Sequence, residues 1–424
     1  MIVELINTGS ELMLGRVLNT HQQWLCRQFA DRGIRVHRQV AVADTAAEIT
    51  AAVRDALGRA DLVVTTGGLG PTSDDLTREA IAKLLGRDLH EDPALVAHIE
   101  AFFAARKRRA PPRTRVQALV PRGARVLPNP HGTAPGLVME VNPNPFRPDG
   151  RPGWLVMLPG PPRELRPMFR ESVVPWLERT FPPTGHWCCR TLRTTGIGES
   201  AAQELLEAPL APLVARGLEI GYCARPGQVD VRLAARSPEA QRLVSEAEAL
   251  VRAQLGPFIY GEEDDELEAV LVRLLTERRQ TLALAESCTG GALAHRLTNV
   301  PGASAVFRAG IVAYANDAKE IFLGVQAGTL AQHGAVSEPT AREMAEGARQ
   351  RAQTDFALAI TGIAGPGGGT ADKPVGTAFI ALATRQQTRV LRVLNPLDRE
   401  TFKQVTTNQA LDLLRREVLS LPAP

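Results

Sequence analysis

The sequence predicts an α/β protein built from two or three domains. Its 424 residues exceed what a single hydrophobic core usually organises. Short apolar runs alternate with segments of helical periodicity, which is the pattern of sheet strands covered by helices. Several of these runs open directly into glycine-rich turns, most clearly at Leu282–Gly291, LALAESCTGG. Such junctions place backbone N–H groups and small polar side chains at the carboxyl edge of a sheet, where α/β folds bind ligands.

The composition indicates a cytoplasmic protein with no membrane partner. The chain is 44% hydrophobic with a net charge of +3, and no apolar run approaches the roughly 18–20 residues that span a bilayer. The first residues, MIVELINTGSE, lack the features of a signal peptide and predict a strand. The five cysteines are odd in number and lack CxxC spacing, which argues against a disulfide framework or a structural zinc site.

Residues 1–180 are predicted to form a doubly wound domain around a parallel sheet. The predicted strands and helices alternate, and Thr45 with Glu48 forms a capping box. The first elements are a strand Ile2–Asn7, a helix Thr20–Arg32, a strand Arg35–Ala43, a helix ending near Arg59, and a strand Asp61–Thr66.

The loop after Thr66, GGLGPTSDDLT, combines glycines with two adjacent carboxylates. Its glycines would let backbone N–H groups approach a phosphate, and Asp74 and Asp75 could hold a divalent ion that faces it. The alternative is a tight turn in which one Asp caps the next helix. The loop has neither the GxGxxG pattern of dinucleotide-binding proteins nor the lysine of a P-loop.

Two further loops, PNPHGTAPG (128–136) and LPGPP (158–162), would lie beside this loop if their strands share one sheet. Between them, NPNPFRPDGRPG predicts an exposed hairpin excursion. The basic run Arg106–Arg109 could contact nucleic acid, but it has no interleaved aromatic residues, and solvated charge is the favoured interpretation.

Residues 184–256 predict a small α+β unit without a catalytic constellation. The acidic stretch YGEEDDELEAV that follows is predicted to be a linker and the start of a helix. The adjacent pair Cys188 and Cys189 is expected to serve packing, because neighbouring cysteines do not easily form a disulfide.

Residues 265–424 predict a third, α/β unit. Ser287 follows a buried strand and precedes a helix, so it is placed as a nucleophile would be. On this segment alone, however, capping of that helix by Ser287 and Thr289 is the favoured interpretation. A strand ending at Tyr314 is followed by a short helix containing Lys319, one of only five lysines in an arginine-rich chain. The buried strand Phe356–Thr361 opens into another glycine-rich loop.

Four stretches of the third unit, AESCTGG, FRAGIVAYANDAK, GAVSEPTA and TGIAGPGGGTADKPVGT, resemble the CinA C-terminal family in their order and spacing. That family includes nicotinamide mononucleotide amidohydrolases of the PncC type. The stretches NTGSELMLGRVLNTH, VTTGGLGPTSDDLTREA, PNPHGTAPG and MLPGPPREL resemble the CinA N-terminal domain, which is related to molybdopterin-binding MoaB/MogA-like folds. With a KH-like middle unit, the resemblance covers essentially the whole chain and implies a full-length CinA protein.

For the third unit, the resemblance implies that Ser287 is the nucleophile of an amide hydrolase and that Tyr314 and Lys319 complete the catalytic set. A desolvated lysine can act as the base, while the tyrosine hydroxyl relays or orients the proton. Cys288 is the rival nucleophile. No cofactor is expected here. The residues expected to bind substrate or the oxyanion are Glu286, Thr289, Gly290, Gly291, Thr361, Gly362, Gly365, Gly367 and Gly368.

For the first unit, the resemblance implies hydrolysis of ADP-ribose, which requires charge neutralisation and an oriented water molecule, both supplied by a divalent metal. Asp74, Asp75 and Glu11 are the expected ligands. GGLGPT stands where molybdopterin-binding relatives have GGTG, which argues against a molybdenum-cofactor role. The residues expected to bind substrate are Gly67, Gly68, Gly70, Pro71, Thr72, Asn129, Gly132, Thr133 and Gly160.

Two hypotheses follow. The first is a bifunctional hydrolase of pyridine nucleotide salvage, which converts nicotinamide mononucleotide to nicotinic acid mononucleotide and ADP-ribose to AMP and ribose 5-phosphate. The second is a non-catalytic protein that binds a nucleotide or pterin and acts in competence or the DNA-damage response. The net charge of +3 and the absence of a DNA-binding motif favour the enzyme, and the resemblance implies a homodimer.

Overall fold

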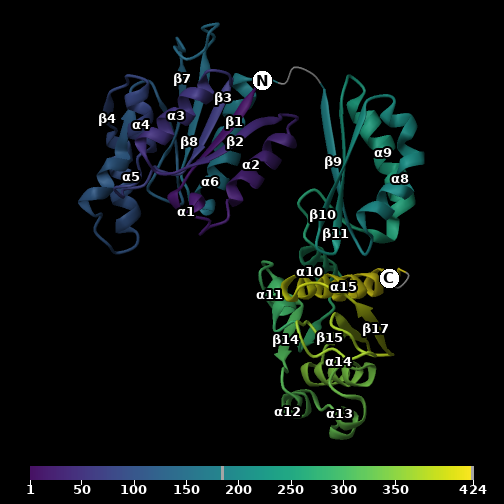
Figure 1. Ribbon diagram of the computed structural model, residues 1–424. Helices are drawn as coiled ribbons and strands as arrows, with labels where there is room; N and C mark the ends of the chain where they lie inside the picture. The colour runs from purple at the N-terminus through teal and green to yellow at the C-terminus, as the bar shows by residue number, and fades with distance from the viewer. Residues whose placement is uncertain (183–185, 422–424) are drawn as a thin grey trace. The chain divides into compact units, whose positions relative to one another are not determined.

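The computed structural model describes residues 1–182 and 186–421. The chain divides into two compact units, Met1–Trp187 and the residues from Cys188 onward. The first unit is one α/β domain, and the second joins a small α+β domain to a further α/β domain (Figure 1). Within the described part of the chain, no helix has the combination of length and apolar character needed to cross a membrane.

The first unit is built on a six-stranded mixed sheet of order β2-β1-β3-β8-β7-β6. Neighbours from β2 to β8 are parallel, but β7 runs antiparallel to both β8 and β6. The sheet, which the alternation of strands and helices predicted to be parallel, is therefore mixed at this edge. The connection from β7 to β8 is the predicted hairpin excursion, and it is too short for the crossover that a parallel pair requires. The strands are β1 Val3–Thr8, β2 Val36–Val42, β3 Leu62–Thr66, β6 Arg125–Leu127, β7 Gly136–Val141 and β8 Gly153–Leu158.

Helices cover both faces of this sheet and form two hydrophobic cores. Helices α3, α4 and α5 pack on one face, while α2, α6 and α7 pack on the other. Every residue of β1 and β3 is buried, as expected for central strands of a sheet that is covered on both faces. The helices are α1 Ser10–Met13, α2 Thr20–Ala30, α3 Ala46–Leu57, α4 Thr77–Leu84, α5 Pro93–Ala104, α6 Pro162–Met168 and α7 Val174–Thr180, with 3₁₀ turn η1 Pro112–Ala118, π turn η2 Phe169–Val173, and a ribbon of β4 Leu89–Glu91 and β5 Leu119–Pro121.

The predicted cap of α3 is present, because Thr45 Oγ1 accepts a hydrogen bond from the Glu48 N–H at 3.3 Å. The Glu48 carboxylate reaches back to the Ala43 N–H at 3.0 Å. The predicted basic run Arg106–Arg109 follows α5 and is exposed, with the Arg106 guanidinium stacked 3.5 Å from the Phe102 ring centroid.

The middle domain is a four-stranded sheet of order β10-β11-β9-β12, with α8 and α9 packed on one core. The strand β12 belongs to this sheet, so the domain extends beyond the predicted boundary at residue 256. The acidic stretch predicted as a linker thus begins with a sheet strand. The elements are β9 Trp187–Thr195, α8 Glu199–Val214, β10 Leu218–Arg225, β11 Gln228–Arg236, α9 Ala240–Leu255, η3 Gly256–Phe258 and β12 Ile259–Glu262.

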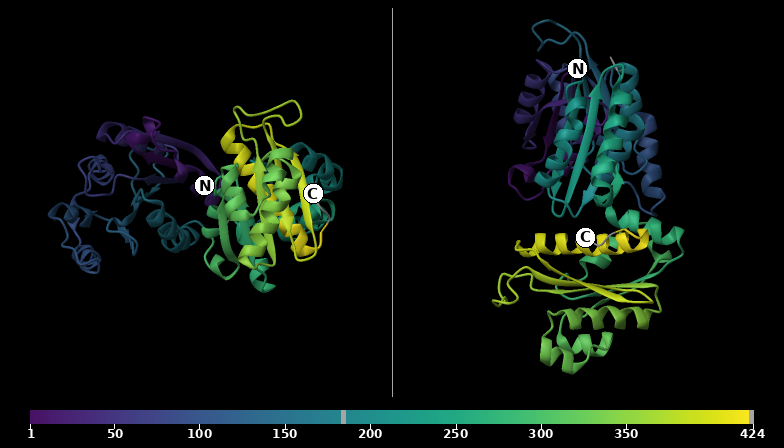
Figure 2. Two further views of the ribbon diagram at one scale, coloured as in Figure 1. Left: turned by 90° about the horizontal axis from the view of Figure 1, so that it is seen from below. Right: turned by 90° about the vertical axis from the view of Figure 1, so that its right-hand side faces the viewer.

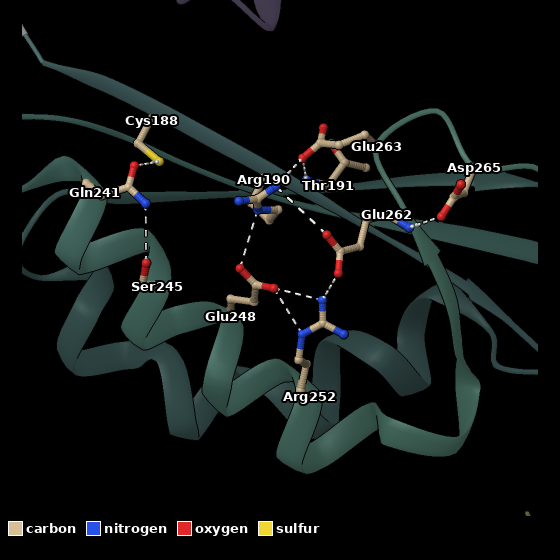
Figure 3. A network of polar contacts seen from close by, with 10 residues as sticks. All are labelled: Cys188, Arg190, Thr191, Gln241, Ser245, Glu248, Arg252, Glu262, Glu263 and Asp265. Carbon is tan, nitrogen blue, oxygen red and sulfur yellow. Dashed lines mark hydrogen bonds and ion pairs between the residues drawn. The ribbon is translucent and has the colours of Figure 1, made fainter.

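A network of ion pairs fastens this acidic segment to its neighbours (Figure 3). Arg190 of β9 lies 3.4 Å from Glu248 of α9 and 3.3 Å from Glu263. Arg252 of α9 pairs with both Glu248 and Glu262. The carboxylates of the predicted linker therefore hold sheet and helix together. The five cysteines are all free, as predicted.

The third domain has a five-stranded sheet of order β14-β13-β15-β16-β17, in which β14, β13 and β15 are parallel and β16 and β17 are antiparallel. Figure 2 shows this sheet between the long helix α15 and helix α14. The elements are α10 Leu267–Glu277, β13 Leu282–Glu286, α11 Ala292–Thr298, η4 Ala303–Ala305, β14 Phe307–Val312, α12 Asn316–Ala318, η5 Lys319–Leu323, α13 Ala327–His333, α14 Glu338–Ala352, β15 Phe356–Gly362, β16 Thr377–Ala383, β17 Thr388–Leu394 and α15 Arg399–Leu419.

Helix α15 joins the third domain to the middle domain. Arg415 donates to the carbonyl oxygens of Pro257 at 2.7 Å and Ile259 at 3.2 Å, and it pairs with Asp412. Arg415 and Asp412 are both buried. Because a buried ion pair with satisfied hydrogen bonds is geometrically demanding, these contacts fix α15 against the end of the middle domain.

Candidate active sites

The first unit has a cavity of about 410 Å³ where the parallel strands β1, β2, β3 and β8 end. Loops that follow the carboxyl ends of parallel strands meet at one edge, so segments far apart in the sequence line it together. The lining residues that the sequence predicted are Glu11, Gly67, Gly68, Gly70, Pro71, Asp74, Asp75, Thr133 and Gly160.

The remaining predicted residues shape the loops around this cavity. Thr72 donates to Asp75 Oδ2 from its N–H at 2.9 Å and from its hydroxyl at 2.5 Å. Asn129 Nδ2 donates to Ala134 O at 2.7 Å and to Glu164 Oε2 at 2.8 Å.

Gly132 lies directly against Glu164. A Cβ built at position 132 would lie 2.0 Å from Glu164 Oε2, so this position admits only glycine while Glu164 stays in place.

Sequence reasoning missed four polar residues of this cavity, namely Thr8, Asp44, Gln117 and Glu164. Asp44 follows the end of β2, and its Oδ2 accepts the Ser10 N–H at 2.7 Å. Glu164 is buried in the first turn of α6. Glu164 lies within the stretch MLPGPPREL that carries the family resemblance, so this stretch is the signal that could have identified the carboxylate.

The predicted metal ligands Glu11, Asp74 and Asp75 line one cavity but do not form a ready-made coordination shell. Among residues 1–182 and 186–421, no group of three or more His, Cys, Asp or Glu side chains lies close enough to hold a metal ion. Hard divalent ions such as Mg²⁺ are often held by only one or two carboxylates together with substrate phosphates. The carboxylates here fit that arrangement rather than a preformed site.

The third domain has a cavity of about 210 Å³ at the carboxyl ends of β13, β14 and β15. It brings together the three residues predicted to be catalytic, Ser287, Tyr314 and Lys319, although Tyr314 and Lys319 are separated from Ser287 by the whole of α11 and β14. Its other lining residues are Cys288, Ala335, Val336, Thr361, Gly362, Ala364 and Arg399.

Ser287 stands on a tight turn between β13 and α11. The Ser287 N–H donates to Ile360 O of β15 at 2.9 Å, and the Gly290 N–H donates to Ser287 O at 3.0 Å. Gly290 and Gly291 have φ of 63° and 92°, a left-handed conformation that other residues rarely adopt. The turn therefore depends on these two glycines, and both lie outside the cavity lining.

Lys319 is 1% exposed, and its ammonium group faces backbone carbonyl groups. Nζ lies 2.9 Å from Ala313 O, 3.1 Å from Tyr314 O and 3.5 Å from Ala315 O. Burial lowers the pKa of Lys319 from its ordinary value of 10.5, because desolvation disfavours the charged form. A neutral amine has two N–H groups for the two shorter contacts, which leaves its lone pair free to accept a proton.

Close packing by α14 places the segment that carries Lys319. A Cβ built at Gly347 of α14 would lie 1.7 Å from Leu323 O, and Arg351 donates to the same oxygen at 2.7 Å. We therefore predict that Gly347→Ala destabilises the domain by about 1–3 kcal/mol through overpacking. Thermal unfolding should show a lowered Tm, and an unchanged Tm would contradict this packing. Gly328→Ala is the matched control, because nothing lies within 4 Å of a Cβ there.

Cys288, the rival nucleophile, is buried beside Ser287. Burial raises the pKa of the Cys288 thiol to about 12. Because the thiolate is the reactive form of cysteine, this environment argues against Cys288 as the nucleophile.

Arg399, at the start of α15, is a site residue that the sequence did not reveal. It donates to Tyr314 Oη at 2.9 Å and to Gly365 O at 2.8 Å, and so connects the predicted catalytic tyrosine to the glycine-rich loop. Because a guanidinium only donates, Tyr314 Oη is the acceptor and its own proton stays available. Thr361 Oγ1 donates to Ala335 O at 2.8 Å.

Several residues predicted to bind substrate are absent from the lining of this cavity. They are Glu286, Thr289, Gly290, Gly291, Gly365, Gly367 and Gly368. Gly365 nevertheless contacts Arg399 through its carbonyl, and Glu286 holds the start of α11.

Comparison with known proteins agrees with this division of the chain. Residues 4–179 match the family described as "Probable molybdopterin binding domain", residues 189–261 match the "Damage-inducible protein CinA KH domain", and residues 264–418 match the "CinA C-terminal domain".

Relatives match over nearly the whole chain. A protein of Symbiobacterium thermophilum whose name describes it as competence-damage inducible is 48% identical over 389 residues, covering 91% of this chain and 89% of the relative. A CinA-like protein of Gemmatimonas aurantiaca is 44% identical, covering 98% and 96%. A crystal structure of a CinA superfamily protein from Klebsiella pneumoniae covers 36% of this chain and 96% of that chain at 36% identity, with a TM-score of 0.36. On the extent and identity of the two sequence relatives, the chain belongs to the CinA family of competence-damage inducible proteins.

Proposed function

We propose that the third domain is a nicotinamide mononucleotide deamidase that uses Ser287 as its nucleophile. The observation that carries this proposal is the convergence of Ser287, Lys319 and Tyr314 on one cavity at the carboxyl edge of the sheet. A hydroxyl can serve as the nucleophile of acyl transfer, and a desolvated amine and a phenol can move its proton when no histidine is available.

The reaction would proceed through an acyl-enzyme. Ser287 Oγ attacks the carboxamide carbon, and its proton passes to the neutral Lys319 amine. The C–N bond of the tetrahedral intermediate then breaks, and the departing nitrogen takes this proton back from Lys319 and leaves as ammonia. A water molecule hydrolyses the resulting ester, which releases nicotinic acid mononucleotide and restores Ser287. Tyr314, held by Arg399, orients the transferred proton.

Arg399 and the glycine-rich loop would bind the phosphate end of the substrate. Arg399 already donates hydrogen bonds to Tyr314 and Gly365, so a phosphate bound to its guanidinium would be held at a fixed position relative to Tyr314. Ammonia release from nicotinamide mononucleotide, compared with nicotinamide riboside, tests this assignment, since loss of the phosphate should raise KM.

We further propose that the first unit hydrolyses ADP-ribose to AMP and ribose 5-phosphate. The support is a cavity that combines a glycine loop with carboxylates from four strand ends. A divalent metal held by one or two of these carboxylates and the substrate's phosphates would neutralise the pyrophosphate. The residues that would hold it are Asp74, Asp75 and Glu11.

A second candidate for the first unit is binding of a pterin or nucleotide without turnover, which the match to a molybdopterin-binding domain favours. Measuring both ADP-ribose binding and AMP release separates the two functions. Saturable binding of ADP-ribose without AMP formation would support the binding protein. The homodimer implied by the sequence resemblance stays a prediction, which sedimentation can test.

We predict that Asp74→Asn and Asp75→Asn each reduce AMP release from ADP-ribose by about 10²-fold or more, because each removes a charge needed at the pyrophosphate. Ammonia release from nicotinamide mononucleotide should be unaffected. Asp149→Asn is the control, since Asp149 is an exposed carboxylate of the hairpin excursion, paired with Arg151. Wild-type AMP release from both variants would place the pyrophosphatase chemistry elsewhere.

A further inference from the structure

Both carboxylate oxygens of Glu286, the residue before the proposed nucleophile, accept hydrogen bonds from the protein backbone. Glu286 is 1% exposed. Its Oε2 accepts the N–H groups of Gly291 and Leu293, both at 3.1 Å, and its Oε1 accepts the Ala294 N–H at 2.8 Å. One side chain therefore satisfies three of the donors that a helix start leaves free.

These bonds decide which N–H groups of the nucleophile turn remain for a substrate. Gly291 is bound by Glu286, and the Gly290 N–H donates to Ser287 O. Within the described residues, the Cys288 and Thr289 N–H groups have no acceptor from another residue. Thr289 is completely buried and does not line the cavity, whereas Cys288 does. The N–H groups of Gly290 and Gly291, which were predicted to bind the oxyanion, thus donate to acceptors within the protein.

We infer that Glu286 is a positioning residue of the deamidase, which fixes the Ser287–Cys288 peptide so that the Cys288 N–H binds the oxyanion. This inference rests on the proposed deamidation. The N–H of the residue after a nucleophile is well placed for this task, because it lies next to the attacked carbonyl.

Geometry explains why a carboxylate is needed at this position. The Glu286 backbone ends β13, while its side chain reaches forward to residues 291–294, so the turn is held at both of its ends. The turn contains two glycines and would otherwise be free to change conformation. A carboxylate only accepts hydrogen bonds and can engage three donors at once, which a neutral amide of the same size cannot.

The test is Glu286→Gln, in which the amide NH₂ must face an N–H donor. We expect kcat for ammonia release to fall about 100-fold while KM stays within about twofold, because a displaced catalytic group affects the transition state more than substrate binding. Glu286→Asp keeps the charge but loses reach, and a similar loss of kcat is expected. If Glu286→Gln does not fold, the Asp variant carries the test, and wild-type kcat in it would overturn the inference.

Glu268→Gln is the matched control. Glu268 also braces α11, through a contact of 2.6 Å with Arg296, but it does so from α10 and holds none of the N–H groups at the turn. We expect wild-type kcat from this variant. An equal loss of kcat in the Glu286 and Glu268 variants would show general support of α11 and overturn the positioning role.

A second measurement separates this inference from the choice of substrate. A fluorophosphonate forms a bond from phosphorus to Ser287 Oγ and loses fluoride, and its phosphoryl oxygen would use the same N–H donor. The labelling rate should fall in Glu286→Gln and not in Glu268→Gln. Labelling that depends on Glu286, in a protein that releases no ammonia, would support the positioning role and reject the proposed substrate. Ammonia release with wild-type kcat in Glu286→Gln would instead support the substrate and reject the positioning role.

Discussion

Replacing Ser287 with alanine should reduce ammonia release from nicotinamide mononucleotide by about 10⁴-fold or more, because the variant cannot form the acyl-enzyme. Cys288→Ala should retain most of the activity. Its thiol has a pKa raised by burial to about 12, so little thiolate forms at neutral pH, and the backbone N–H at this position is unchanged by the substitution. Steady-state rates of ammonia release for both variants and the wild type provide the measurement.

The two substitutions also separate the possible mechanisms. Mass spectrometry after rapid quenching should find the nicotinoyl nucleotide ester on wild-type protein and not on Ser287→Ala. If only Cys288→Ala loses activity, the proposed deamidation stands, but its nucleophile is the Cys288 thiol. A wild-type protein that releases no ammonia at all would leave ADP-ribose hydrolysis as the leading function.

Lys319→Met should lower kcat for ammonia release by about 10³-fold, within the range expected for loss of a general base. The pH dependence gives the sharper test. Burial lowers the pKa of Lys319 below 10.5, and only the neutral amine can accept the Ser287 proton. Activity should therefore fall as the pH decreases through this lowered pKa and reach a plateau above it. The residual activity of Lys319→Met should lack this acid limb.

Lys403→Met is a suitable control for the Lys319 substitution. Lys403 is a partly buried lysine of α15 that does not line the cavity around Ser287. If the Lys319→Met variant shows the same acid limb as the wild type, the assignment of Lys319 as the base is contradicted. A limb that persists in Lys403→Met and disappears in Lys319→Met would support it.

Both proposed sites use the same arrangement, in which buried parallel strands end in glycine-containing loops. In the first unit the loop after β3 carries the two aspartates, and in the third domain the turn after β13 carries Ser287. Because parallel strands end at one edge, each site collects residues from several loops with little dependence on the rest of the chain. We therefore expect substitutions at one site to leave the activity proposed for the other site unchanged.

Local patterns were enough to predict much of this protein. The predicted strands that correspond to β1, β3, β13 and β15 are buried, and Thr45 caps α3 by accepting the Glu48 N–H at 3.3 Å. These features depend on neighbouring residues in the sequence. The motifs around Ser287, Tyr314 and Lys319 also located the residues that share one cavity.

Tertiary structure decided the features that depend on residues distant in sequence. Arg399 meets Tyr314 across 85 residues, and the acidic segment near Glu262 pairs with β9 rather than forming a linker. Strand β7 is antiparallel because its connection to β8 is short. The alternation of strands and helices in the sequence did not predict this direction.

The role of Glu286 shows the physical reason most clearly. Its position in the ESCTGG motif indicated importance, but sequence alone suggested that it binds substrate. Only the folded backbone brings three N–H groups to its carboxylate, while no other residue of the described chain accepts a hydrogen bond from the Cys288 N–H. The sequence by itself thus determined which strands are buried and which motifs carry chemistry, whereas the partner of each polar group was set by the folded chain, because hydrogen-bond partners depend on three-dimensional proximity.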